Sequence, residues 1–387
     1  LPESLLAEVT DDLPENAIQI VGASDGRFDP SDYILFYGKG PDNWSYLPSE
    51  KRFSMQKHLY DDRGYYFIKV DSEDGKRVAS VPSAAANSYS STTFDDFDRF
   101  EAEETNLMHE WDKSQGSGKK WYGDHFKNAR SYSYNKLFSF PNPEPGNHTT
   151  IRAEMAIRSL SRSAFFVEVN GNRYQSEPAP RVSRLAGIGD NEVDYAKTAV
   201  LEHTTNISSP DWDVVVAYPY PGGSGDGSEA WLDFIEVNTR RQLQMEGAQL
   251  QFRDTRSLDY PDTRYSISQT SENTLVWEVT DPLNPANRQF SRQGNNILFG
   301  AQGSLLRTFI VFDPTQTLLA PEAIGRISNQ NLHAISEVDM LIVYHPDFQT
   351  EALRLQSHRS SFDELKVSIA SVDEIYNEFS SGSTDPT

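Results

Sequence analysis

The sequence contains no cysteine. Its 387 residues can therefore form no disulfide and no thiolate metal site, and they offer no cysteine nucleophile. Long apolar runs are missing as well. The longest, such as Val214–Tyr218 and Met340–Tyr344, have the length of a strand, whereas a membrane-spanning helix needs about 18 or more consecutive apolar residues. The sequence therefore predicts no membrane-spanning helix.

Positive charge is also scarce. The chain has 35 Lys and Arg against 57 Asp and Glu, which gives a formal net charge of −22. A surface this anionic repels the phosphate backbone of nucleic acids and the headgroups of an anionic bilayer. We therefore expect no nucleic-acid partner.

Turn-forming and aromatic residues are plentiful, with 23 Gly, 21 Pro and 12% aromatics. This composition favours strands and turns over helix bundles. Evenly spaced β-branched and aromatic segments follow one another from Ser131 to about Asp254, and Asn170-Gly171 supplies a hairpin turn. Such spacing is typical of a β-sandwich or jelly roll. We predict a mainly β fold of tandem β-rich, sandwich-like domains, with a β-rich domain over 1–130 and a sandwich-like region over 131–330.

Two segments of the first domain carry specific predictions. Tyr65–Val70 has the composition of a strand closed by the turn Asp74-Gly75. Thr92–Trp111 carries apolar residues at spacings of three and four, which predicts a helix near 92–111. Its acidic residues lack the spacing of a calcium loop, so we expect them to form a solvated helix face rather than a cation site. They are Asp95, Asp96, Asp98, Glu101, Glu103 and Glu104.

The pattern changes after residue 330. Val338–Tyr344 and Lys366–Ala370 fit strands, and Asp347–Arg359 between them fits a helix. Strand, helix and strand in this order predict a right-handed βαβ unit with parallel strands. Two parallel strands cannot bury both of their faces, so we expect residues 331–387 to open a larger α/β domain and the chain to be a fragment. Packing of this segment as an appendage on the β domains is the alternative.

Few residues suggest chemistry. None of the eight His forms a His-x-x-x-His pair, and we expect no metal and no cofactor. Trp44, Tyr46 and Trp121 lie in aromatic loops and are candidates for stacking against a ligand, although packing of the loop onto a sheet is the favoured explanation for Trp44 and Tyr46. A surface module that binds carbohydrate or protein is thus one interpretation of the chain.

Five collinear stretches resemble the sortases of the type IX secretion system, the PorU family, whose catalytic part is a gingipain-like C25 cysteine peptidase. The matching stretches are Asp32–Tyr46, Ser117–Phe126 (SGKKWYGDHF), Trp231–Ile235, Val276–Pro282 and Val338–Thr387, with VDMLIVYHPDF and VDEIYNEFSSGSTDPT in the last. The final stretch is similar to the start of the C25 catalytic domain, which has a caspase-like α/β fold.

The resemblance implies the non-catalytic N-terminal portion of a cell-surface, outer membrane-associated sortase. Such an enzyme removes C-terminal signal domains from secreted cargo and transfers the cargo to anionic lipopolysaccharide. It uses a Cys nucleophile and a His base. The resemblance also implies outer-membrane secretion components as partners. Both family residues lie in the domain beyond the Asn-Glu-Phe-Ser segment, so no catalytic residue is assigned in this chain, and we expect the chain to be inactive alone.

Overall fold

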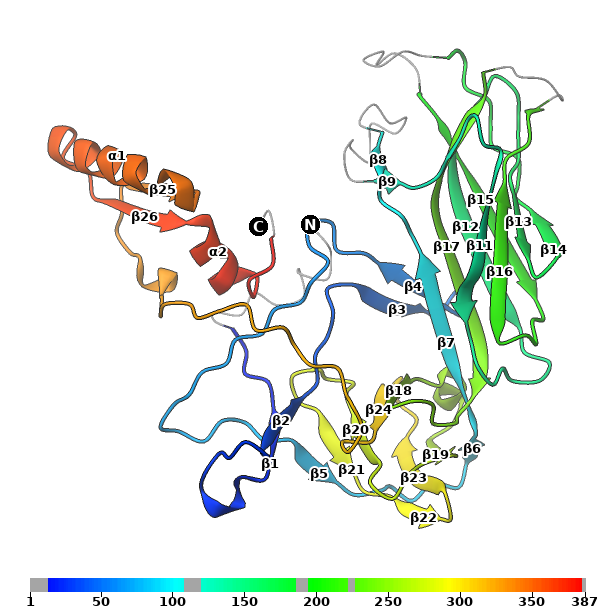
Figure 1. Ribbon diagram of the computed structural model, residues 1–387, viewed down its shortest axis with the longest axis horizontal. Helices are drawn as coiled ribbons and strands as arrows, with labels where there is room; N and C mark the ends of the chain where they lie inside the picture. Colours follow the sequence, from blue (N-terminus) through cyan, green and yellow to red (C-terminus); the bar gives the residue numbers. More distant parts are fainter. Residues whose placement is uncertain (1–12, 108–119, 186–193, 222–226, 385–387) are drawn as a thin grey trace.

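The computed structural model describes residues 13–107, 120–185, 194–221 and 227–384. In these ranges strands dominate, and the two α-helices lie near the C-terminus (Figure 1). The prediction of a mainly β fold with a βαβ unit at its end is confirmed. Short 3-10 turns occur at Ala23–Asp25, Thr255–Asp259, Leu332–Ala334 and Pro346–Phe348. In the described ranges, no helix has the length and apolarity needed to cross a membrane.

The first β-sandwich packs a five-stranded sheet against a four-stranded sheet. The five-stranded sheet contains β10 (His125–Phe126), β17 (Glu229–Gln242), β12 (Thr149–Arg158) and β15 (Lys197–Thr205), with β7 (Thr93–Phe100) also paired to β17. The four-stranded sheet has the order β11 (Ser131–Ser139), β16 (Asp211–Ala217), β13 (Phe166–Val169) and β14 (Asn172–Gln175). Inward side chains of both sheets, among them Ile151, Phe165 and Trp212, form one buried core.

The hairpin between β13 and β14 turns at Asn170-Gly171, as the sequence predicts. Both residues have positive φ angles, 48° and 82°. A two-residue hairpin turn of this kind matches the right-handed twist of its strands, and Asn-Gly is the pair that adopts it at least cost.

The second sandwich has the same two-layer plan. One sheet runs β18 (Gln249–Phe252), β24 (Phe309–Phe312), β20 (Leu275–Glu278), β21 (Ala286–Arg288) and β5 (Ala79–Val81). The other runs β22 (Ser291–Gln293), β23 (Asn296–Gln302), β19 (Asp262–Ile267) and β6 (Tyr89–Ser91). Its core is rich in aromatic rings, with Phe252, Tyr265, Phe299 and Phe309 in mutual contact.

Three small two-stranded sheets lie on the surfaces of the sandwiches. They are β1 (Ile18–Val21) with β2 (Tyr33–Phe36), β3 (Asn43–Leu47) with β4 (Arg52–Gln56), and β8 (Thr105–Asn106) with β9 (Trp121–Tyr122). Strands from before residue 130 also join the large sheets, since β7 pairs with β17, β6 with β19 and β5 with β21. The division at 130 and 330 stays a prediction, and chain segments from either side of residue 130 share sheets.

The helix predicted over Thr92–Trp111 is wrong. Thr93–Phe100 forms β7 and Thr105–Asn106 forms β8, while residues 108–111 lie outside the described ranges. Phe94 enters the second core, Phe100 packs against the first, and Phe97 lies on Trp44. One face of β7 contributes to the two sandwich cores, and Phe97 on the other face packs against the β3–β4 hairpin. The sequence of β7 therefore does not show the regular alternation of apolar and polar residues that marks a half-buried strand.

The predicted solvated acidic face is wrong for the same reason. Asp95 and Asp96 of β7 are ion-paired to two consecutive arginines of β17, at 2.7 Å to Arg240 and 2.7 Å to Arg241. Glu101 pairs with Arg99, and Glu103 pairs with Lys57. Several of these carboxylates therefore form ion pairs within or next to β7, and those of Asp95 and Asp96 connect it to β17.

Tyr65–Val70 does not form the predicted strand. The segment is exposed and pairs with no strand among the described residues. Ile68 is 81% exposed and Val70 is 94% exposed. A sequence of high β propensity thus lies on the surface without a sheet.

The βαβ unit follows a long linker, residues 314–331, that leads away from the second sandwich (Figure 1). β25 (Met340–Tyr344) and β26 (Val367–Ser371) pair in parallel, and α1 (Gln349–Phe362) connects them. α2 (Val372–Phe379) then starts at a capping box made by Ser371 and Glu374. The predicted order of strand, helix and strand is confirmed.

Candidate functional site

The β3–β4 hairpin is fixed to the outer face of the first sandwich by polar side chains of β17. Glu236 is fully buried and accepts hydrogen bonds from Arg52 Nη1 at 2.8 Å and from the Met55 amide at 3.0 Å. Asn238 accepts from the Phe53 amide at 2.6 Å and donates to the Phe53 carbonyl at 2.9 Å. Sequence reasoning missed Glu236, although an acid inside the apolar run Trp231–Val237 signals a buried partner.

The candidate ligand-stacking residues fall in two places. Trp44 and Tyr46 lie on β3, where Trp44 packs against Phe97 with ring centroids 4.4 Å apart and Tyr46 packs against Phe53 at 5.3 Å. Trp121 lies on β9 and is 42% exposed. The aromatic rings of β3 thus belong to packed contacts, and the ligand-binding role of all three residues stays a prediction.

A charged cluster lies on the outer face of the same sheet. Lys120 Nζ lies 2.6 Å from Glu154 on β12 and 3.0 Å from Asp233 on β17. Burial raises the pKa of Asp233 to about 7, and the nearby carboxylate of Glu154 adds to this shift while Lys120 opposes it. The cluster can exchange a proton near neutral pH. Burial would lower the pKa of Lys120, but the charges of Asp233 and Glu154 raise it, so the amine stays protonated and is not a nucleophile.

A second polar cluster ties the linker to α2. Both carboxylate oxygens of Glu378 accept from the Leu332 amide, at 2.7 and 2.8 Å, and Oε1 also accepts from the His333 amide at 2.9 Å. His333 Nδ1 lies 2.6 Å from Glu378 Oε1, and Gln330 Nε2 donates to Oε2 at 3.0 Å. Burial alone would raise the pKa of Glu378, but these hydrogen bonds lower it to about 2. We call Gln330, Leu332, His333 and Glu378 the linker clasp.

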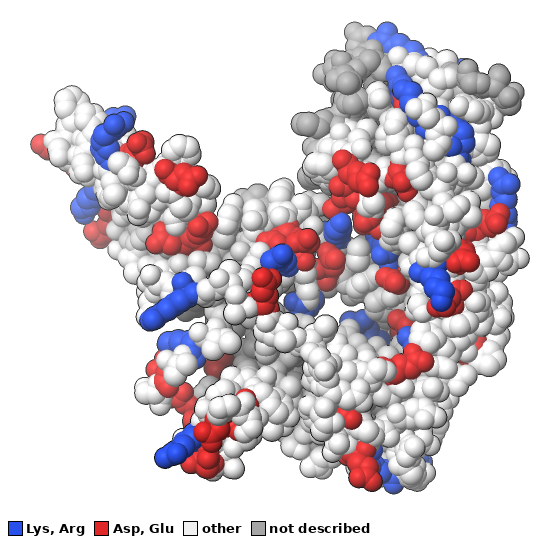
Figure 2. Space-filling model, in the orientation of Figure 1, with Lys and Arg blue, Asp and Glu red and all other residues white. Residues whose placement is uncertain are grey.

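The βαβ unit exposes much of its apolar surface. Leu341 and Val343 of β25 are 47% and 51% exposed. Several larger apolar side chains of the unit are exposed as well: Phe348, Leu353, Leu355, Phe362 and Phe379. Figure 2 shows the molecular surface hollowed between this unit and the first sandwich, with acidic side chains on both sides of the hollow.

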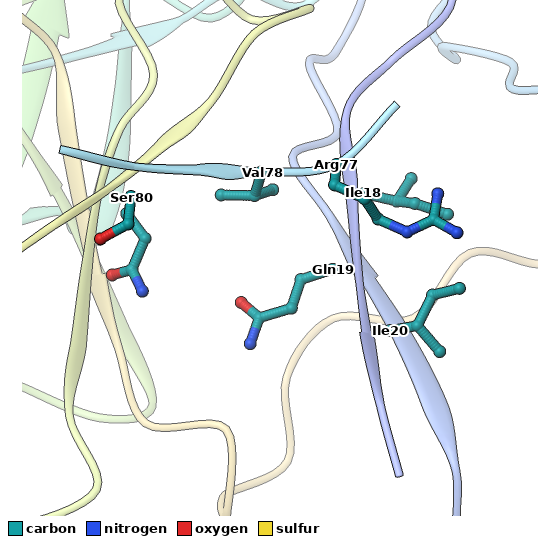
Figure 3. A pocket seen from close by; sticks show the side chains of 7 residues that line it. Ile18, Gln19, Ile20, Arg77, Val78 and Ser80 are labelled. Carbon is teal, nitrogen blue, oxygen red and sulfur yellow. The ribbon is translucent and has the colours of Figure 1, made fainter. Parts of the chain in front are cut away.

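A shallow cavity lies beside the β1–β2 hairpin (Figure 3). It has a volume of about 300 Å³, and its lining residues are Ile18, Gln19, Ile20, Arg77, Val78, Ser80 and Asn287. The lining has one charged group, Arg77, which donates to the Gly75 carbonyl. With no His, Asp or Glu beside Ser80, this lining cannot activate a nucleophile. Across the described ranges, no three His, Asp or Glu side chains are arranged to hold a metal ion.

The comparisons with known proteins bear on these features in two ways. Residues 333–387, which begin at the linker clasp and contain the βαβ unit, match the model of peptidase family C25. The whole chain superposes on latent, dimeric PorU from Porphyromonas gingivalis with a TM-score of 0.78 and 23% identity. The chain has a PorU-like fold. The match includes 100% of this chain and 35% of the PorU chain, so this chain spans about a third of the length of that relative.

Two further solved structures match with TM-scores too low to support an argument about this chain. A CBM36 domain of a xylanase from a Trinervitermes trinervoides hindgut metagenome gives a TM-score of 0.19 at 9% identity, over 37% of this chain and 95% of that one. A CBM36 module in complex with calcium and xylotriose gives 0.19 at 14% identity, over 36% and 98%. No curated protein matches the sequence.

Proposed function

We propose that this chain is the non-catalytic N-terminal portion of a type IX secretion sortase at the cell surface. In this proposal a longer polypeptide removes C-terminal signal domains from cargo and attaches the cargo to anionic lipopolysaccharide. The observation that carries it is the PorU-like fold over the whole chain, together with the match of residues 333–387 to peptidase family C25. The exposed apolar side chains of the two-stranded parallel sheet support it, because such a sheet is ordinarily covered on both faces.

The β-sandwiches would bind outer-membrane secretion components and place the cargo before the peptidase domain. This assignment is supported by β7, which pairs with β17 and contributes side chains to both sandwich cores, and by the hollow that separates the first sandwich from the C25-like unit (Figure 2). The nucleophile would belong to residues outside this chain, because the 387 residues contain no Cys.

The experiment uses the full-length gene product and a cargo protein with its C-terminal signal domain, followed by mass spectrometry of the cargo. Cargo should lose the domain, and prior treatment of the enzyme with iodoacetamide should abolish this loss. The 387-residue chain, as a matched control, should leave the cargo intact. Processing that persists after alkylation, or processing by the 387-residue chain itself, would contradict the proposal.

A further inference from the structure

The segment Tyr65–Val70, named here the apolar strap, has strand-like composition and no sheet among the described residues. Ile68 and Val70 are 81% and 94% exposed, and Tyr66 and Phe67 are 40% and 41% exposed. Four neighbouring apolar side chains exposed to this degree are costly to leave in water, and extended apolar segments readily add to sheets. The strap is therefore a surface suited to an interaction.

One end of the strap is held in a defined place. Gly64 approaches the Lys39 carbonyl so closely that an added Cβ would lie 2.8 Å from that oxygen. The Tyr66 hydroxyl donates to the Lys39 carbonyl at 3.0 Å, and the ring of Tyr66 packs on Phe36 of β2 at 5.2 Å. These contacts hold the strap in place at Tyr66, and the more exposed residues Ile68 and Val70 follow directly after it.

The same end already contacts the C25-like segment. The Thr384 amide donates to Asp61 at 3.2 Å, and the Ser383 hydroxyl donates to the Arg63 carbonyl at 3.5 Å. Gly382 has a φ of +87°, and a Cβ there would lie 3.2 Å from Tyr65 and 3.4 Å from Phe67. An interface between the strap region and residues 382–384 therefore exists, and the exposed part of the strap continues from it.

We propose that the apolar strap is a docking strand for the peptidase domain that residues 333–387 begin. This inference rests on the proposed function, in which that domain continues beyond the parallel pair β25–β26. The occupant is the same polypeptide, because the contacts at Gly382–Thr384 bring the C25-like segment to the strap and the match to PorU covers only 35% of that chain. Docking would fix the orientation of the peptidase domain at a second point besides the linker.

The test is hydrogen exchange of the full-length gene product, read by mass spectrometry. Amides of residues 65–70 should exchange at least about tenfold more slowly than those of Asp71–Gly75, the polar segment that follows directly and is exposed except at Gly75. Ile68→Asp, and independently Val70→Asp, should remove this protection. Leu160→Asp, at a 43% exposed site on the first sandwich, should leave it unchanged.

Equal exchange in residues 65–70 and 71–75 would overturn the docking inference. Protection that disappears on dilution would also overturn it, because the occupant would then be a second copy of the chain. Cargo processing is measured on the same sample. Processing with an unprotected strap refutes docking alone, and a protected strap without processing refutes the proposed function alone.

Discussion

The first sandwich buries its apolar side chains, whereas the βαβ unit leaves most of its apolar side chains exposed. The sandwich closes its two sheets around a continuous core in which Phe165, Val167 and Val216 have no exposed surface. In the βαβ unit, the described residues from 333 to 384 include only two buried apolar side chains, Ala352 and Ala370. Since buried apolar area supplies most of the stability of a fold, the sandwich can be stable by itself while the βαβ unit depends on neighbouring structure.

The largest expected effect comes from the sandwich side of this comparison. Trp212→Ala removes a ring that is 1% exposed and packed on Phe138 and Phe140, and it should lower the free energy of unfolding by about 3 to 5 kcal/mol. Phe362→Ala, at a 76% exposed ring of α1, should change it by less than about 0.5 kcal/mol. Denaturant titration checks both. Similar losses for the two variants would break the comparison.

The junction between the sandwiches should be the next most sensitive place. Arg240 bridges Asp95 at 2.7 Å and the fully buried Asp254 at 2.9 Å, and burial raises the pKa of Asp254. Arg240→Ala leaves that carboxyl without its cation and should cost about 3 kcal/mol.

The matched control for this junction is Arg256→Ala. Arg256 pairs with Glu144, but 47% of its side chain is exposed, so its removal should cost at most about 1 kcal/mol. Urea titration measures both variants. Equal costs would mean that the buried bridge does not join the two sandwiches.

The next prediction concerns the βαβ unit, which the linker clasp connects to the linker. Glu378→Ala removes the acceptor of the Leu332 and His333 amides, so these amides should exchange about tenfold faster or more, while amides in β12 remain unchanged. Because the folded pKa of Glu378 is about 2, below that of an unfolded Glu, the clasp is intact above about pH 4.3 and is lost as the pH falls toward 2. Exchange that is unaffected by the substitution would show that other contacts hold the linker.

The last prediction concerns the pH dependence of the first sandwich. The pKa of Asp233, about 7 in the fold, exceeds that of an unfolded Asp, about 3.9. The stabilising contribution of this group is complete below pH 4 and is lost as the pH rises to 7. Asp233→Asn should flatten this part of the curve of Tm against pH.

Glu322→Gln serves as the control for Asp233, because the Glu322 side chain is 80% exposed. It should leave the curve unchanged. A wild-type Tm that does not fall between pH 4 and 7 relative to Asp233→Asn would contradict the assigned shift.

The sequence was sufficient where local pattern and final environment agree. Asn170-Gly171 forms its hairpin, and the order of strand, helix and strand after residue 338 is confirmed, because each depends on neighbours in the chain. The prediction failed for β7, whose Phe94 and Phe100 enter two different cores while Phe97 packs outside both. No window of sequence contains these partners. Glu236 and Glu378 were missed for the same reason, since their donors lie 181 and 46 residues away at Met55 and Leu332.

The length of β17 has a mechanical consequence. Its 14 residues extend about 45 Å at 3.3 Å per residue, and they carry the pairing with β12 at one end and with β7 at the other. A force applied to the tip of the first sandwich would load many backbone hydrogen bonds in shear rather than one after another. The same strand carries Arg240, whose ion pair with Asp254 links the first sandwich to the second, so one continuous strand connects the body of the first sandwich to that junction.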